Sequence, residues 1–402
     1  MSYMNFLDKL LDGVTVEWRP LGDLGKLVRG NGLQKKDFTE TGIPAIHYGQ
    51  IYTYYGLSTT STKSFVSPEL AQQLRKVNNG DVVITNTSEN LEDVGKALVY
   101  LGECQAVTGG HATILKPGEC LLGKYFAYFT QTDEFAGEKR KYAKGAKVID
   151  VSAKDMAKML IPIPCPDTPK KSLEIQAEIV RMLDTFTELT NELTNELTAR
   201  KKQYNHYRDQ LLSSEDKDVE WKTLGSLVDI NTGSKPPEIL EGATSFDYIN
   251  AGTSRSGYSA ASNCAGDTVT TPSRGQGGIG HVGYQNKPFW LGPLCYKLRS
   301  TDLTVLINKY LFYFLQSRSE MLLGLKKEGG VPAVNKSDLV QLEIPVPSVE
   351  EQKRIVAILD KFDALSNSMT EGLPREIELR QKQYAYYRDL LMSFPKPEAV
   401  EV

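Results

Sequence analysis

The sequence is poor in the features that mark exported and membrane proteins. Its 402 residues include only five cysteines, which are far apart and never form a C-x-x-C pair, so we expect buried free thiols rather than a disulfide framework. No apolar run approaches the ~20 residues that a membrane span needs. The start, MSYMNFLDKLLDG, lacks the basic and then apolar layout of a signal peptide. These absences predict a cytoplasmic protein that does not associate with a membrane.

Motifs of catalysis are equally scarce. The four histidines fit neither H-E-x-x-H nor a zinc spacing, so no metal site is expected. There is no lysine-bearing phosphate loop, no paired-carboxylate arrangement and no Asn-Pro-Pro-aromatic tetrapeptide of the kind that amino-methyltransferases use. A net charge of −3 argues against a surface that is basic throughout but leaves room for local basic patches. Nothing in the sequence indicates covalent chemistry.

One glycine-rich segment matches a cofactor motif. Residues 275–280, GQGGIG, fit G-x-G-x-x-G, which is typical of loops that bind dinucleotides or S-adenosylmethionine. That motif should end a strand and open a helix, whereas residues 281–284, HVGY, have the character of a strand. We therefore predict a glycine-rich hairpin that lets the backbone approach a partner closely.

The chain does contain an internal repeat, which is sought before any other motif. Its landmarks follow the same order in both halves, which chance does not supply. The chain is therefore expected to alternate two globular domains with two helices. The repeated landmarks are V-E-W-x-x-L-G at 16–22 and 219–225, I-P-x-P at 161–164 and 344–347, and R-x-K-Q-Y-x-x-Y-R-D at 200–209 and 380–389.

Two long amphipathic helices are predicted, at about 172–213 and 348–393. Apolar side chains recur in both in steps of three and four, which keeps one stripe on a helix. Neither helix can bury this stripe alone, so we expect the two to lie against each other as an antiparallel coiled coil. Pro374 is expected to kink or restart the second helix, because proline removes a backbone donor.

The predicted fold class is α+β, with two mixed α/β domains separated by the two helices. DKLL at 8–11 echoes DQLL at 209–212, so the N-terminal segment is expected to pack near the C-terminal helix and to close a circular pseudo-twofold plan. The predicted parts are a helical segment at 1–15, a first globular domain at 16–168, a central helix at 169–215, a second globular domain at 216–347 and a C-terminal helix at 348–402.

Within each domain the sequence predicts matching elements. Short β-branched stretches at 81–85 and 267–271 are expected as corresponding strands. The aromatic segments after Lys124 and Lys309 are expected as short buried helices. Further strands are predicted at 106–115 and 289–298.

Polar, aromatic and basic side chains gather where the two halves differ most. Lysine and arginine hold phosphates, while asparagine, glutamine and arginine recognise base edges through paired hydrogen bonds. For any single residue a solvated loop is the commoner outcome, but the clusters occupy matching places in both halves. The candidate DNA-binding residues are Lys35, Lys36, His47, Tyr48, Gln50, Tyr52, Asn86, Thr87, Lys141 and Lys144 in the first half, and Lys235, Asn250, Thr253, Ser254, Arg255, Ser273, Arg274, Gln276, His281, Lys326 and Lys327 in the second.

Together these landmarks resemble the specificity subunits of type I restriction-modification enzymes over essentially the whole chain. The repeated Leu-Thr-Asn-Glu at 189–196 is similar to the IC group of that family. The resemblance implies a DNA-binding subunit without catalytic activity, in which each domain recognises one half of a bipartite, asymmetric site in double-stranded DNA. The helices would set the gap between the halves. The loops of this family vary, so the candidate residues rest on chemistry alone.

The resemblance also implies partners and the place of the cofactors. Two methyltransferase (modification) subunits and two restriction and translocase subunits would dock on the chain. S-adenosylmethionine, ATP and Mg²⁺ are expected in those partners, and no cofactor is expected in this chain. Two alternatives stay open: an adenine-DNA methyltransferase that uses residues 275–280, and a structural adaptor whose domains bind proteins rather than DNA.

Overall fold

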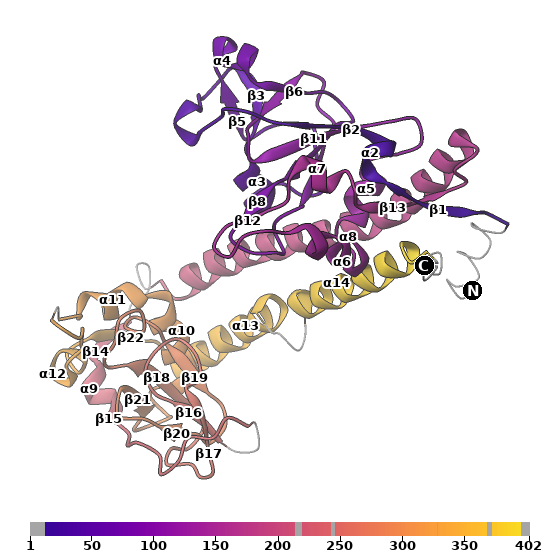
Figure 1. Ribbon diagram of the computed structural model, residues 1–402. Coiled ribbons are helices and arrows are strands. Elements are labelled where there is room, and N and C mark those ends of the chain that lie inside the picture. Colours follow the sequence, from indigo (N-terminus) through magenta and orange to yellow (C-terminus); the bar gives the residue numbers. More distant parts are fainter. Residues whose placement is uncertain (1–12, 214–218, 243–245, 328, 368–371, 395–402) are drawn as a thin grey trace. The chain divides into compact units, whose positions relative to one another are not determined.

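The computed structural model describes residues 13–213, 219–242, 246–327, 329–367 and 372–394 (Figure 1). Contacts between residues divide the chain into two units, which are described separately. Unit 1 comprises Met1–Asn191 with Glu378–Val402, and unit 2 comprises Glu192–Ile377. Each unit groups one globular domain with parts of both long helices, so the limits predicted between domains and helices stay a prediction. Of the predicted N-terminal helical segment, residues 1–12 lie outside the described residues.

The repeated motifs close each globular domain in the same way. In unit 1, β1 (Val16–Pro20) pairs antiparallel with β13 (Leu160–Pro164), so that V-E-W meets I-P-x-P. In unit 2, β14 (Glu220–Thr223) pairs antiparallel with β22 (Glu343–Val346). One-turn helices follow at α2 (Leu21–Leu24) and α9 (Leu224–Leu227). The glycine of each motif lies close against the opposite segment: a Cβ on Gly22 would lie 3.1 Å from the Cβ of Ala157, and one on Gly225 would lie 2.8 Å from that of Val340.

Unit 1 contains a five-stranded and a four-stranded sheet. The first has the order β2-β11-β7-β9-β4 and the second the order β5-β3-β10-β6. A separate two-stranded pair joins β8 to β12. The bounds are β2 (Gly25–Arg29), β3 (Ile43–Ile46), β4 (Ser58–Thr59), β5 (Ser64–Val66), β6 (Arg75–Val77), β7 (Val82–Thr85), β8 (Thr87–Ser88), β9 (Ala97–Tyr100), β10 (Ala106–Thr108), β11 (Ala112–Pro117) and β12 (Ile149–Asp150), with η1 (Lys35–Asp37), α3 (Tyr48–Thr53), α4 (Pro68–Gln73), α5 (Gly123–Phe129), α6 (Asp133–Tyr142) and α7 (Ala153–Met156) between them.

Unit 2 repeats the central part of this plan. Its four-stranded sheet has the order β15-β21-β18-β19, which matches β2-β11-β7-β9, and a three-stranded sheet has the order β17-β16-β20. The predicted correspondence of 81–85 with 267–271 is therefore confirmed in β7 and β18. The bounds are β15 (Val228–Thr232), β16 (Phe246–Ile249), β17 (Gly257–Ser259), β18 (Thr268–Pro272), β19 (Gly283–Gln285), β20 (Trp290–Leu291), β21 (Cys295–Ser300), α10 (Asn308–Ser317), α11 (Ser319–Gly324) and α12 (Lys336–Leu339).

The further strands predicted at 106–115 and 289–298 are present, and each stretch contains two of them. Residues 106–115 form β10 and β11, and residues 289–298 form β20 and β21, and in each case the two strands belong to different sheets. The break falls at Gly109-Gly110 in unit 1 and at Gly292-Pro293 in unit 2. These residues favour turns over continuous strand, and the chain changes sheets there.

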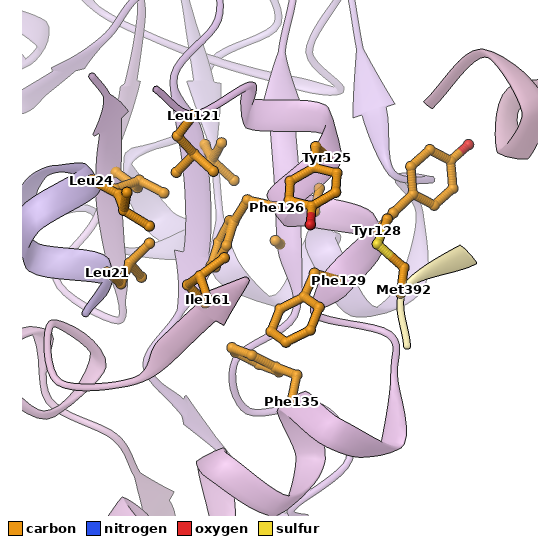
Figure 2. Close-up of a cluster of buried hydrophobic side chains, with 14 of the residues drawn as sticks. Leu21, Leu24, Leu121, Tyr125, Phe126, Tyr128, Phe129, Phe135, Ile161 and Met392 are labelled. Atoms are coloured by element: carbon orange, nitrogen blue, oxygen red, sulfur yellow. The ribbon is translucent and has the colours of Figure 1, made fainter. Parts of the chain in front are cut away.

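The core of unit 1 surrounds the aromatic helix α5. Residues 125–129 of this helix are all buried, which confirms the predicted buried helix. Around them pack Leu21 and Leu24 of α2, Ile161 of β13 and Met392 (Figure 2). In unit 2, α10 takes the same place, with Tyr310, Tyr313 and Phe314 buried among other apolar side chains.

The first long helix is α8 (Pro169–Leu211). The second repeated segment forms α13 (Val349–Asn367) and α14 (Gly372–Leu391), and residues 368–371 between them lie outside the described residues. The predicted restart is thus found two residues before Pro374, which occupies the first turn of α14. Proline is tolerated there, because the first backbone N–H groups of a helix have no partner within the helix. Within the described ranges, no helix combines the length and the apolar character that crossing a membrane requires.

Each globular domain is hydrogen-bonded to the helix that follows it through a glutamine, and the two glutamines occupy corresponding positions in the repeat. Gln176 of α8 accepts a hydrogen bond from the backbone N–H of Leu122 at 2.8 Å. Gln352 of α13 accepts one from the N–H of Ile307, also at 2.8 Å. Both glutamines are fully buried, so these bonds would be costly to lose. Two further matching contacts are the hydrogen bonds from Tyr128 to Asp184 and from Tyr313 to Asp360.

Candidate nucleic-acid interface

Unit 1 contains a cleft of about 590 Å³ beside α3. One side of the cleft is formed by α3 and the residues just before it, and another by residues 87–93. The cleft brings together six of the residues that the sequence nominated, namely Lys35, His47, Tyr48, Gln50, Tyr52 and Thr87, and adds Phe38, Ser88, Glu89, Asn90, Asp93 and His111.

Aromatic rings in mutual contact line this cleft. The ring of Tyr48 packs against the imidazoles of both His47 and His111, with centroids 4.5 and 4.8 Å away and ring planes tilted by 39° in each case. Tyr52 meets Tyr48 edge to face at 5.9 Å. In a double helix the base faces are covered by neighbouring base pairs, so these rings can contact base edges and sugars only, and sequence specificity must come from polar groups beside them.

His47 supplies one such polar group. Burial, together with the charges of Lys35 and His111, lowers the pKa of His47, so its imidazole is neutral at neutral pH. Its Nδ1 accepts a hydrogen bond from the backbone N–H of Gly49 at 3.1 Å, which leaves the proton on Nε2. His47 can therefore donate a hydrogen bond to a base acceptor without carrying a charge.

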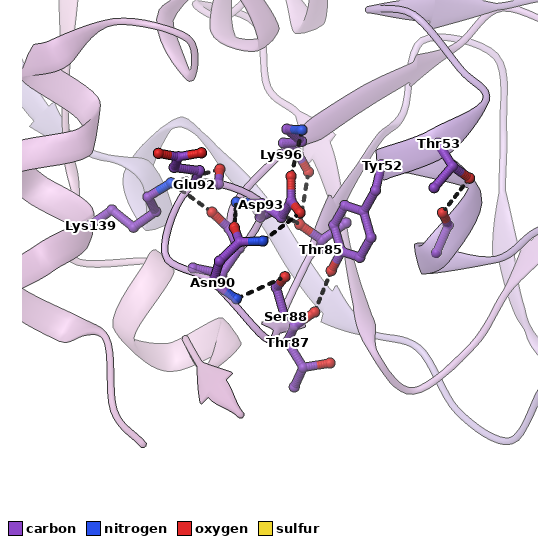
Figure 3. A network of polar contacts seen from close by, with 12 residues as sticks. Tyr52, Thr53, Thr85, Thr87, Ser88, Asn90, Glu92, Asp93, Lys96 and Lys139 are labelled. Atoms are coloured by element: carbon purple, nitrogen blue, oxygen red, sulfur yellow. Dashed lines mark hydrogen bonds and ion pairs between the residues drawn. The ribbon is translucent and has the colours of Figure 1, made fainter. Parts of the chain in front are cut away.

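The cleft wall at 87–93 is part of a longer loop that we call the unit 1 hairpin, residues 86–96, which joins β7 to β9. The hydroxyl of Tyr52 donates to the carbonyl of Thr87, and the hydroxyl of Thr87 lies 2.8 Å from Nδ1 of His111. Asn90 donates to Asp93, and Lys96 forms an ion pair with Asp93 at 2.5 Å (Figure 3). Burial raises the pKa of Tyr52 to about 12, so its hydroxyl remains a donor at neutral pH.

Four nominated residues of the first half lie outside the cleft lining. Asn86 is fully buried: its Nδ2 donates to the carbonyl of Val151 and its Oδ1 accepts from Thr113, each at 2.9 Å. Both ends of this amide are used inside the protein, so the structure places Asn86 in the scaffold rather than on a DNA-binding surface. Lys36 is exposed, and Lys141 and Lys144 pair with Glu138 and Asp155.

Unit 2 contains a smaller pocket of about 90 Å³, which collects Asn250, Thr253, Ser254, Arg255 and His281. The guanidinium of Arg255 lies 4.2 Å from the ring centroid of Tyr258 and 3.2 Å from a carboxylate oxygen of Asp247. These contacts fix the plane of the guanidinium. Asn250 is partly engaged, because its Oδ1 accepts from the backbone N–H of Leu294 at 2.9 Å.

The remaining nominated residues of the second half do not line this pocket. Ser273 is buried, and the backbones of Arg274 and Lys327 both bridge to Ala333. Lys327 also forms an ion pair with Asp338 at 3.3 Å. The others outside the lining are Lys235, Gln276 and Lys326.

The glycine-rich segment forms the hairpin that the sequence predicted. Residues 273–282, which we call the unit 2 hairpin, join β18 to β19, which pair antiparallel. No helix follows the G-x-G-x-x-G residues, so the phosphate-binding arrangement of strand, loop and helix is absent at this place. Among the described residues, no three or more His, Cys, Asp or Glu side chains are grouped so that they could hold a metal ion.

Comparison with known proteins gives concordant results. Residues 13–200 and 216–379 match the family described as type I restriction modification DNA specificity domain. The chain is 38% identical to the EcoR124I/EcoR124II specificity subunit of Escherichia coli, over 100% of both chains, and 32% identical to the EcoprrI specificity subunit of the same species, over 92% and 93%. Its fold is similar to that of a type I restriction-modification system S subunit from M. genitalium, with a TM-score of 0.61, 17% identity and coverage of 96% and 98%.

Proposed function

The chain belongs to the family of type I restriction-modification DNA specificity subunits, and from this we propose that its two units bind the two halves of one bipartite site in double-stranded DNA. The observation that carries the proposal is a shared scaffold with unlike sites. β7 and β9 correspond to β18 and β19, and the hairpin between each pair borders the cleft or pocket of its unit. Matching scaffolds with different lining residues are what two half-sites of different sequence require.

The chemistry of the two linings supports different base preferences. The unit 1 cleft offers aromatic faces, the Nε2–H of His47 and the carboxylate of Glu89 on its rim. The unit 2 pocket offers the guanidinium of Arg255 and the hydroxyl groups of Thr253 and Ser254. Arginine suits guanine O6 and N7, whereas a carboxylate accepts from cytosine N4. Unit 2 is therefore expected to prefer a guanine in its half-site, whereas unit 1 is not.

We place the reactions in other polypeptides. The chain would recognise the DNA sequence and would dock two modification subunits and two restriction and translocase subunits. Those subunits would bind S-adenosylmethionine, ATP and Mg²⁺. The two Escherichia coli relatives are named as specificity subunits of restriction enzymes. An adenine-methyltransferase activity of the chain itself is not supported, because the glycine-rich segment is a hairpin between two strands.

The long helices are proposed to set the gap between the half-sites. α8 runs without interruption from residues assigned to unit 1 into residues assigned to unit 2. The repeated Leu-Thr-Asn-Glu at 189–196 spans the boundary at residue 191. A change of four helical residues corresponds to ~6 Å along the helix axis, which is of the order of one or two base steps.

The decisive experiment is methylation mapping of DNA from cells that hold this chain together with its modification subunits. We expect two short fixed sequences separated by a gap of constant length. Tyr48→Phe, which removes one hydroxyl from the unit 1 cleft, should relax only one of the two sequences, and Arg255→Ala should relax only the other. Tyr54→Phe is the control, because Tyr54 is exposed and does not line the cleft.

Three outcomes would count against this function. Methylation at sequences that do not consist of two separated parts would contradict the proposed bipartite site. Tight, stoichiometric binding of S-adenosylmethionine by the isolated chain would favour the methyltransferase alternative. If footprinting shows no paired protected segments even with the modification subunits present, the adaptor alternative is favoured.

A further inference from the structure

The unit 1 hairpin has two faces, and only one of them borders the cleft. Ser88, Glu89, Asn90 and Asp93 line the cleft. On the other face a second cavity of about 490 Å³ lies between the globular domain and α14, and Glu92, Lys96 and Lys139 line it. The hairpin is thus a thin wall whose position decides where the cleft-lining side chains stand.

The far face of this wall is held by Lys139 of α6. Its ammonium donates to the carbonyl of Val94 at 2.8 Å and to that of Glu92 at 3.3 Å (Figure 3). The side chain is buried, with 6% exposed, and among the described residues the ammonium forms no ion pair. Its hydrogen bonds go to neutral carbonyls, and burying a charge without a paired counter-ion is costly. We therefore look for a role of the ammonium beyond packing.

The stem of Lys139 also fits the backbone of the hairpin. Gly95 has a φ of +81°, and a Cβ at this position would lie 3.0 Å from Cδ of Lys139. Only glycine adopts this conformation without strain and leaves room for the lysine stem. The fully buried Thr85 completes the anchorage, because its hydroxyl donates to the carbonyl of Asp93 at 2.9 Å.

In unit 2 the corresponding hairpin also meets the helix that follows the aromatic helix, but through an apolar side chain. Gly280, with a φ of +92°, lies three residues before β19, and a Cβ there would lie 2.7 Å from Cγ of Leu323. Leu323 belongs to α11, which follows the aromatic helix α10 as α6 follows α5. A contact that recurs with unlike residues indicates that the position of the hairpin, rather than the contact itself, is what both units retain.

We propose that Lys139 is a positioning residue for DNA recognition, which fixes the unit 1 hairpin from behind so that its cleft-lining side chains meet one half-site. The proposal rests on the function proposed above. Lys139 does not line the cleft and acts through the carbonyls of Glu92 and Val94. Loss of this anchorage leaves the protein folded and able to bind, but with a cleft wall that tolerates wrong bases.

The test is a competition between two duplexes in one tube, with the full-length chain and its modification subunits. One duplex carries the mapped site and the other carries a single substitution in one half-site. Their ratio in the bound fraction measures base discrimination and does not depend on how much protein is active. Lys139→Met should lower discrimination about tenfold in one half-site, the size of one good base contact, and leave the other half-site unchanged.

Two further variants make the result unambiguous. Arg140→Met removes a positive charge from the next residue of α6, which is exposed, and should leave both ratios unchanged. Thr85→Val removes one hydroxyl donor to the same hairpin and should lower discrimination in the same half-site as Lys139→Met. It decides the matter if Lys139→Met fails to fold.

The outcomes separate the two proposals. Unchanged ratios in Lys139→Met, with or without weaker total binding, would show a merely structural lysine and overturn the inference. An equal change in both half-sites would also overturn it. If the unmodified chain with its modification subunits shows no pair of half-sites, the proposed function itself fails, whatever the variants do.

Discussion

The ring of Phe186 in α8 stacks on the ring of Tyr387 in α14, with centroids 5.1 Å apart and planes inclined by 21°. Within unit 2, Tyr207 of α8 stacks on Phe362 of α13 at 6.0 Å and 25°. Tyr207 and Tyr387 occupy the same place in the repeated R-x-K-Q-Y-x-x-Y-R-D. The two helices therefore meet twice through the same pair of residue types, once in each unit, with the partners exchanged.

This pairing predicts a measurable coupling between Phe186 and Tyr387. A double-mutant cycle of Phe186→Ala and Tyr387→Ala, followed by urea unfolding, should give a coupling energy of about 0.5–1.5 kcal/mol, as expected for stacked aromatic rings. The cross pair Phe186→Ala with Tyr207→Ala is the control. These residues are ~31 Å apart along α8 at 1.5 Å per residue, so their effects should add. Equal coupling in both cycles would rule out a local contact.

The length of α8 should control the target. Inserting one Leu-Thr-Asn-Glu unit after Glu192 adds ~6 Å of helix and rotates the apolar stripe only slightly. Methylation mapping should then show the same two half-sites with an altered gap. Replacing 189–196 by eight alanines keeps the length and should keep the gap. Altered half-sites after the insertion would contradict the proposed role of the helix.

Lys144 should contribute to the salt dependence of DNA binding. Lys144 and Lys158 both form ion pairs with Asp155, at 3.2 and 3.0 Å, so their alanine variants remove comparable protein contacts. If Lys144 also contacts a phosphate, Lys144→Ala should reduce the slope of log K against log salt by about 0.9, whereas Lys158→Ala should leave it unchanged. The double variant Lys326→Ala with Lys327→Ala should reduce the slope further. If all variants have the same slope as the unmodified chain, these lysines do not contact DNA phosphates.

Lys139 should make stability depend on pH in the alkaline range. Burial lowers the pKa of Lys139 to about 8 from the ordinary 10.5, so between these values the unfolded chain binds more protons than the folded one. The free energy of unfolding of the unmodified chain should therefore rise with pH, relative to Lys139→Met, by ~2 kcal/mol between pH 7 and 10. Urea unfolding at several pH values tests this, with Arg140→Met as the control. A constant difference would mean that the ammonium is not buried in solution.

Much of the architecture could be predicted from the sequence because it is repeated. V-E-W-x-x-L-G and I-P-x-P recur in register with each other, and the structure pairs them as β1 with β13 and β14 with β22. The apolar stripe of α8 predicted a helical partner, and the contact of Phe186 with Tyr387 supplies it. A repeat tests each local pattern twice, which is why these predictions held.

The sites were harder to predict because they depend on which side of a short segment faces outward. Asn86 and Thr87 are neighbours with similar chemistry, yet the first is buried in the scaffold and the second borders the cleft. His111 was not nominated, since only the turn at Gly109-Gly110 brings its ring beside Tyr48. Lys139 reads in the sequence as one more member of a basic run, and only its burial distinguishes it from Arg140.

The core of unit 1 includes Leu391, Met392 and Phe394 together with Trp18 and Leu21. During synthesis these late residues leave the ribosome roughly 370 positions after the early ones, so the first domain cannot finish folding when its own stretch has been translated. Unit 2, whose residues end at Ile377, is complete sooner. A nascent chain that stops before residue 391 therefore lacks part of the apolar core of its N-terminal domain. Premature termination near the C-terminus thus destabilises the domain that is synthesised first.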